Sequence, residues 1–138
     1  MSTPLLQLRE LSVSAGTTRL LDAIDLQLAP GECLGILGPS GSGKSLTALS
    51  LIDLLPRGLT RRYAQLAWRG QDLSAAQLGA LRGREIAYVF QDAASSLHPM
   101  RRVLDQLSET LQYHGLASGR DAPAAARAQL AALGLDQP

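Results

Sequence analysis

The chain has 138 residues, of which 46% are hydrophobic, and its formal net charge is +1. These values are typical of one soluble globular domain, and the small net charge gives no indication of a nucleic-acid partner. A single cysteine excludes an internal disulfide and favours a reducing compartment, and no apolar run approaches the roughly 18 residues needed to cross a bilayer.

The first elements predicted are β-strands. Residues 5–13 and 20–28 alternate apolar and polar side chains, as half-buried strands do. The turn at 15–18 separates them, so we expect an antiparallel pair. Pro30 and Gly31 then interrupt the chain before the short apolar run 33–37, which predicts a buried parallel strand.

A glycine- and serine-rich loop at 38–43 precedes a predicted helix over 44–55, whose apolar residues cover most of its circumference. Residues 63–68 favour another short strand. Residues 74–81 predict a short helix, and Ser74 is suited to cap its N-terminus.

The last part of the chain changes in character. The apolar run 86–90 predicts a further buried strand that ends at Gln91. Beyond it, residues 103–114 and 122–133 have helical periodicity and composition. The order is therefore a β-rich part, an α/β part and a helical part.

The loop at 38–43 belongs to a phosphate-binding motif. The pattern G-x-x-x-x-G-K-[ST] is matched at every fixed position by Gly38-Pro39-Ser40-Gly41-Ser42-Gly43-Lys44-Ser45. An apolar run precedes it and a predicted helix follows it, as the motif requires. A chance glycine-rich turn is the alternative, and this context argues against it.

The chemistry of the motif explains its residue types. Glycines allow successive backbone N–H groups to converge on phosphate oxygens, and the helix N-terminus attracts the same negative charge. Lys44 is the only lysine among 13 basic residues, which marks a place for a compact ammonium beside the β- and γ-phosphates. The Ser45 hydroxyl is expected to ligate Mg²⁺. The predicted nucleotide-binding residues are Gly38, Pro39, Ser40, Gly41, Ser42, Gly43, Lys44, Ser45 and Leu46.

The layout of the whole chain resembles the ATP-binding subunits of ABC transporters. It has the antiparallel β pair, Pro-Gly-Glu before the phosphate-loop strand, and a second strand that ends in Gln91. The segment Phe90-Gln91-Asp92 with Ser96-Leu97-His98-Pro99-Met100 is similar to the branch that imports dipeptides, oligopeptides or nickel, which typically has Ser-Leu-Asn-Pro there.

The resemblance implies an α/β fold: a P-loop NTPase core with an N-terminal antiparallel β subdomain and the start of a helical subdomain. The chain is then a single partial ATP-binding domain over 1–138, with its β part at 1–30, its core at 31–96 and its helical part at 97–138.

The resemblance also assigns roles and cofactors. ATP and Mg²⁺ are expected, with Lys44 and Gln91 in catalysis and with Ser45 and Gln91 at the metal. Gln91 would contact Mg²⁺ or the attacking water and relay the nucleotide state to the membrane subunit. A glutamine that merely ends a strand is the alternative.

Partners follow from the same resemblance. We expect membrane permease subunits, a second ATPase subunit and, indirectly, an extracytoplasmic substrate-binding protein, which together imply a cytoplasmic protein peripheral to the inner membrane. The alternatives are an ABC protein that acts on ribosomes or DNA without a permease, and a remnant that does not hydrolyse ATP.

Two departures from the family pattern are visible. Ala15 stands where the family usually stacks an aromatic side chain on adenine. After Gln91 the sequence has no Ser-Gly-Gly-Gln segment, no apolar run ending in Asp-Glu and no switch histidine. We therefore expect a truncated or partial chain that folds poorly and does not hydrolyse ATP by itself.

Other polar residues have simpler interpretations. Cys33, His98 and His114 are too scattered for a metal site, and Trp68 is expected to pack. Arg101 and Arg102 form either a solvated pair or a permease contact. No catalytic role is assigned to Asp72, Asp92 or Asp105, since none ends a buried strand.

Overall fold

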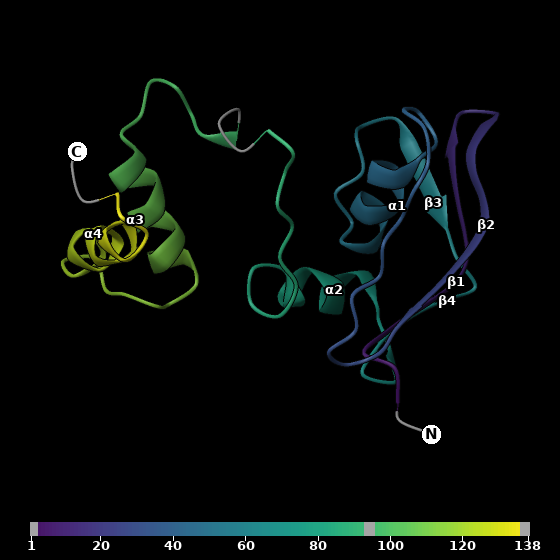
Figure 1. Ribbon diagram of the computed structural model, residues 1–138, viewed down its shortest axis with the longest axis horizontal. Helices are drawn as coiled ribbons and strands as arrows, with labels where there is room; N and C mark the ends of the chain where they lie inside the picture. The colour runs from purple at the N-terminus through teal and green to yellow at the C-terminus, as the bar shows by residue number, and fades with distance from the viewer. Residues whose placement is uncertain (1–2, 93–95, 136–138) are drawn as a thin grey trace. The chain divides into compact units, whose positions relative to one another are not determined.

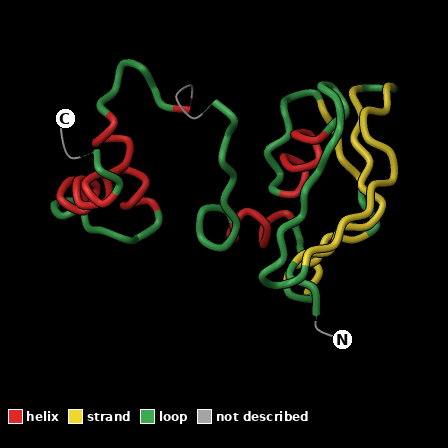
Figure 2. Tube along the Cα trace, viewed as in Figure 1, coloured by secondary structure: helices red, strands yellow, loops and turns green. Residues whose placement is uncertain are grey.

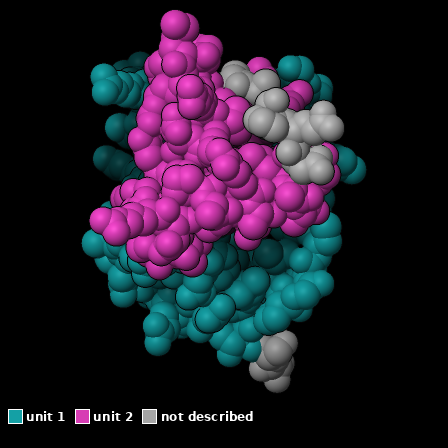
Figure 3. Space-filling view, turned by 90° about the vertical axis from the view of Figure 1, so that its left-hand side faces the viewer, with its two compact units in different colours: residues 1–86 teal, residues 87–138 magenta. Residues whose placement is uncertain are grey.

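The computed structural model describes residues 3–92 and 96–135. The chain divides into two compact units, Met1–Ile86 and Ala87–Pro138, which Figure 3 colours separately. The first unit contains the strands and two helices, and the second contains two helices. The subdivision predicted from the sequence, with parts beginning at 31 and 97, does not coincide with this boundary and stays a prediction.

The first unit is organised around a long β-hairpin. Strands β1 (Leu6–Ala15) and β2 (Thr18–Leu28) pair antiparallel, as predicted, and both are longer than expected on the turn side. Ala15 pairs with Thr18, so only two residues form the turn. The first of them, Gly16, has φ of 57°, the left-handed backbone that such tight turns require.

Three shorter strands complete the sheet. The far edge of β1 pairs antiparallel with β3 (Leu59–Arg62) along its second half and with β4 (Gln65–Trp68) along its first half. Strand β5 (Gln71–Asp72) extends the sheet from β4. Strand β4 confirms the strand predicted near 63–68, whereas β3 was not predicted.

The register of the hairpin shifts at three places, between Leu8 and Leu11, between Leu11 and Val13, and between Val13 and Ser14, and the first two shifts are of opposite sense. Between Leu8 and Leu11, β1 has one residue more than β2, and between Leu11 and Val13 it has one fewer. The extra residues Glu10 and Ala23 both have positive φ, at 53° and 47°. The extra residue Glu10 lets Leu8 and Leu11, three positions apart, share the buried face of β1 with Val13, and the opposite shift at Ala23 restores the register with β2.

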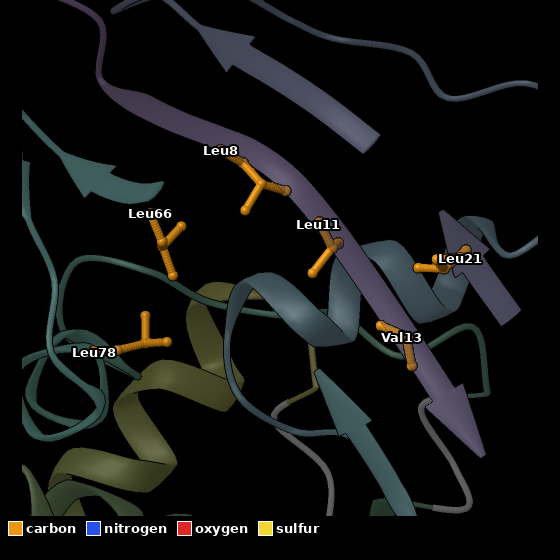
Figure 4. Packing of buried hydrophobic residues seen from close by; sticks show 6 residues of the cluster. All are labelled: Leu8, Leu11, Val13, Leu21, Leu66 and Leu78. Carbon is orange, nitrogen blue, oxygen red and sulfur yellow. The ribbon is translucent and has the colours of Figure 1, made fainter. Parts of the chain in front are cut away.

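The core lies against that face (Figure 4). It consists of six buried side chains, namely Leu8, Leu11, Val13, Leu21, Leu66 and Leu78. Leu78 comes from α2 (Ala75–Leu81), the predicted short helix, where the Ser74 hydroxyl accepts the Gln77 N–H and the Gln77 side chain accepts the Ser74 N–H. Leu46 and Leu51 from α1 (Lys44–Leu51) pack against the same cluster.

Two predicted strands are wrong. Residues 33–37 and 86–90 run as loop (Figure 2), except that Ile86 makes one parallel bridge to Arg82. Leu37 is 95% exposed and Val89 is 86% exposed, so neither run is buried. A strand exists only when a neighbour supplies its hydrogen bonds, and no strand in residues 3–92 and 96–135 pairs with 33–37.

The second unit consists mainly of two helices (Figure 1). α3 (Val103–Tyr113) and α4 (Ala122–Ala132) confirm the two helices predicted there, and they pack against each other. Ser108 on α3 and Ala122 and Ala126 on α4 are buried, which is the close approach that small side chains allow. No helix in the described part of the chain has the length and apolar character to cross a membrane.

Candidate functional site

The predicted phosphate-binding loop precedes α1 in the first unit. Residues 38–42 are exposed, and α1 begins at Lys44 with Gly43 as its N-cap in the left-handed conformation, φ 90°. A Cβ at position 43 would lie 2.4 Å from Leu21 Cδ2. Glycine at this position is therefore favoured by the backbone conformation, and any larger residue would force the Leu21 side chain to shift.

The Lys44 side chain holds the phosphate-binding loop together through hydrogen bonds to its backbone. Its Nζ donates to the carbonyl oxygens of Gly38 and Pro39, both at 2.8 Å, and lies 3.5 Å from the Ser42 hydroxyl. The chain thus curls around a single ammonium group and keeps positive charge in the concavity of the loop. The compact ammonium donates to both carbonyls from one nitrogen, as a point charge on a flexible stem can.

The first turn of α1 leaves backbone donors for an anion. The first hydrogen bond of the helix is donated by Thr47 N to Gly43 O at 2.8 Å, and the Thr47 hydroxyl also donates to that oxygen at 3.0 Å. The N–H groups of Lys44, Ser45 and Leu46 precede this bond, so no carbonyl one turn earlier can accept them. These donors, the glycine conformations and the ammonium fit a phosphate group.

A groove of about 480 Å³ lies beside the loop. It is lined by β2, by the exposed segment 34–37 and by Ser42, Lys44 and Thr47. Asp25 of β2 also lines it, and the hydrogen bond from Glu10 N holds the pKa of that carboxyl below its ordinary value of 3.8. The groove therefore has an anionic wall on β2 and a cationic one at the loop.

The remaining predicted site residue, Gln91, is exposed and belongs to the second unit, whereas the phosphate loop belongs to the first. Its role at the metal therefore stays a prediction. Within the described residues no three His, Cys, Asp or Glu side chains gather as a metal site. His98 serves its own loop, because its Nδ1 accepts the Met100 N–H at 3.2 Å.

Three other residues considered in the sequence analysis have local partners. Arg101 forms a two-pronged pair with Glu109 on α3, which lowers the pKa of that carboxyl and raises the pKa of the guanidinium. Asp72 accepts from Gln65 Nε2 at 2.7 Å. Trp68 is half-buried, and its indole N–H donates to Glu85 at 3.2 Å.

Comparison with known proteins identifies the family of this chain. Residues 21–137 match the ABC transporter family. The chain belongs to this family. This match confirms, at the level of the family, the resemblance inferred from the phosphate loop and from the segment around Gln91.

Among curated relatives, this ABC transporter chain is 40% identical over 131 residues to a nickel import ATP-binding protein of Pseudomonas putida. It is 39% identical over 128 residues to a protein named as a peptide import ATP-binding protein in Brucella abortus. The alignments cover 95% and 88% of this chain, but 48% and 39% of those proteins. The chain thus spans about half or less of the length of these relatives.

The sequence did not predict the role of two arginines at the C-terminal end of α1. Arg61 on β3 donates to Ser50 O, and Arg82, after α2, donates to the carbonyls of Ile52 and Asp53. These arginines lie 11 and 29 positions in sequence from the nearest carbonyl that each one reaches. No local pattern in the sequence could have shown that both converge on one helix end.

Proposed function

We propose that this chain is the nucleotide-binding part of an ATP-binding subunit that energises a membrane importer. Membership of the ABC transporter family supports this assignment, and the observation on which it mainly rests is the loop that curls around Lys44 at the start of α1. The loop offers an ammonium and the N–H donors of a helix N-terminus, the groups that bind nucleotide phosphates.

Each loop residue has a proposed role in binding MgATP. The N–H groups from Gly41 to Leu46 would donate to phosphate oxygens, and Lys44 would exchange its carbonyl partners for the outer phosphates. The Ser45 hydroxyl, exposed on the first helical turn, would hold Mg²⁺. Mg²⁺ would neutralise phosphate charge and help to orient the nucleotide.

The hydrolysis step is proposed only for the complete protein. There Lys44 would stabilise charge on the outer phosphate, and Gln91 would contact Mg²⁺ or orient the attacking water through its amide oxygen. A second ATPase subunit would complete the arrangement, and membrane permease subunits would receive the conformational signal at the cytoplasmic face of the membrane.

The cargo is proposed from the relatives. The names of two of these relatives specify import of nickel and of peptides, so peptides or nickel are the proposed substrates of the complete importer. The cargo would be delivered by an extracytoplasmic substrate-binding protein, and the ATP-binding part would not touch it.

Calorimetric titration of MgATP into the 138-residue chain tests the binding proposal, after circular dichroism has verified folding. Lys44→Ala should weaken binding about 10- to 100-fold, because charge-assisted hydrogen bonds to the phosphates are lost. Arg62→Ala removes a positive charge from exposed β3 and should leave binding unchanged. Equal binding by the Lys44→Ala variant and the unsubstituted chain would overturn the proposal.

A further inference from the structure

The helix that begins at the phosphate loop is fastened at its opposite end by two arginines. α1 has eight residues and ends at Leu51, and the last carbonyls of any helix lack intrahelical donors. Arg61 Nη1 donates to Ser50 O, while Arg82 Nη1 donates to Ile52 O at 3.4 Å and to Asp53 O at 3.3 Å. We call Arg61 and Arg82 the arginine clamp.

Arg61 makes the stronger half of this clamp. Its Nη2 lies 3.1 Å from Asp53 Oδ1, and its side chain is only 10% exposed. The guanidinium also lies over the Tyr63 ring, 5.3 Å from the centroid. Asp53 has φ of 57°, an uncommon conformation for a residue with a side chain. One planar group thus holds both the helix end and the turn that follows it.

The clamp connects α1 to the sheet. Arg61 lies on β3 and faces Val13 of β1 in the antiparallel register. At the other end of α1, residues 33–40 lead into the helix without belonging to a strand. The position of α1 on the sheet therefore depends on its packed side chains, among them buried Thr47 and Ser50, and on the clamp.

We propose that the arginine clamp positions α1, and with it the donors of the phosphate loop, for nucleotide binding. A helix of eight residues spans about 12 Å, so loosening one end displaces the other. The cations at its C-terminus also complement the helix dipole, whose positive end would face the phosphates of a bound nucleotide. This inference rests on the proposed binding of MgATP by the loop.

Arginine is better suited than lysine to this role. The guanidinium donates through two different nitrogens, to Ser50 O and to the Asp53 carboxylate, in a fixed planar geometry. A lysine at position 61 would keep the charge but act as a point donor. Arg61→Lys should therefore recover part of the function that Arg61→Met loses.

The test compares MgATP affinity in the 138-residue chain and its variants by calorimetry. Arg61→Met should weaken binding about tenfold and Arg61→Lys by less, because the donors of the loop lose their alignment. Arg62→Met is the matched control, since Arg62 is the exposed neighbour on the same strand, and it should bind like the unsubstituted chain. Amide hydrogen exchange across residues 44–51, without nucleotide, should accelerate only in the Arg61 variants.

Each outcome decides between the two proposals. If the Arg61→Met variant folds and has the same MgATP affinity and the same amide hydrogen-exchange rates as Arg62→Met, the proposed role of the clamp is overturned. Should Arg61→Met fail to fold, two other variants are compared with Arg62→Met in the same way: Asp53→Asn, which removes the carboxylate partner of Arg61, and Arg82→Met, which removes the other arginine of the clamp. Absence of Lys44-dependent binding in the unsubstituted chain overturns the proposed function instead, and accelerated exchange would still show that the clamp holds α1.

Discussion

The carboxylate of Asp25 accepts the backbone N–H of Glu10 across the β1–β2 hairpin, at 2.8 Å. Glu10 is the bulged residue of β1, whose N–H has lost its partner in the ladder. Ala23, the extra residue of β2, also has a side-chain partner on the opposite strand, because its N–H donates to the Ser12 hydroxyl at 3.0 Å. Each strand therefore supplies a side chain that satisfies the bulge of the other.

The bond between Glu10 and Asp25 predicts a pH dependence of stability. The Glu10 N–H is the main cause that lowers the pKa of Asp25 below 3.8, with a smaller contribution from Arg9. A carboxyl whose pKa is lower in the folded state stabilises the protein above its unfolded-state pKa, and this stabilisation is lost as pH falls through the folded-state value.

Asp25→Asn should therefore melt at a lower temperature than the unsubstituted chain at neutral pH. The difference should shrink as the pH is lowered below 3.8 and the native carboxyl becomes protonated. Thermal melts followed by circular dichroism over this range measure it. Asp22→Asn, which removes an exposed carboxylate that pairs with Arg19 three residues away, is the control. A difference that does not depend on pH would contradict the assignment.

Gly43→Ala should destabilise the first unit more than Gly41→Ala does. Both glycines have positive φ, at 90° and 81°, so each substitution costs about 1–2 kcal/mol of backbone strain. Only at position 43 would the new Cβ also meet a neighbour, 2.4 Å from Leu21 Cδ2. Urea unfolding of both variants separates backbone strain from the contact with Leu21. Equal losses in the free energy of unfolding would show that the Leu21 side chain moves aside without cost.

Leu11→Ala should lower the free energy of unfolding by about 2–5 kcal/mol. The side chain is 1% exposed and lies in the middle of the core cluster on β1. Leu20→Ala makes the same chemical change at a position that is 45% exposed, and it should cost well under half as much. Denaturant midpoints of the two variants, with unchanged slopes, give the comparison.

Ser74→Ala should cost about 1 kcal/mol of stability by removing the N-cap of α2. The Ser74 hydroxyl accepts the Gln77 N–H at 3.3 Å, and the Gln77 side chain accepts the Ser74 N–H at 2.8 Å. Gln77→Ala removes the acceptor of the Ser74 N–H and of the Ser74 hydroxyl, which donates to Gln77 Oε1 at 2.7 Å, but it keeps the backbone N–H that the cap accepts and should cost less. The two thermal melts, compared with that of the double variant, show whether the bonds act as one unit.

The sequence predicted those elements whose signals are local. The hairpin followed from alternation, α2 from a cap and a short helical run, and the phosphate loop from a fixed spelling of glycines and one lysine. In the structure Lys44 Nζ donates to the Gly38 carbonyl oxygen and a Cβ at position 43 would lie 2.4 Å from Leu21 Cδ2, while phosphate binding by the loop stays a prediction.

Predictions that depend on a distant partner failed. The runs 33–37 and 86–90 have the apolar composition of buried strands, but composition does not provide a neighbouring strand, and both run as loop. Conversely, β3 contains Thr60, Arg61 and Arg62, which give no strand signal, and it forms because β1 offers an open edge. The arginine clamp escaped prediction for the same reason.

The offsetting bulges of the hairpin constrain how its length can change during evolution. Deleting Glu10 alone would move Leu6 and Leu8 out of phase with β2 and β4 simultaneously, since β1 pairs with both there. Deleting Ala23 together with Glu10 would leave a regular ladder from Leu6 to Val13, and the separate register shift between Val13 and Ser14 would remain. Single-residue insertions and deletions in this hairpin should therefore survive selection only as matched pairs, one on each strand.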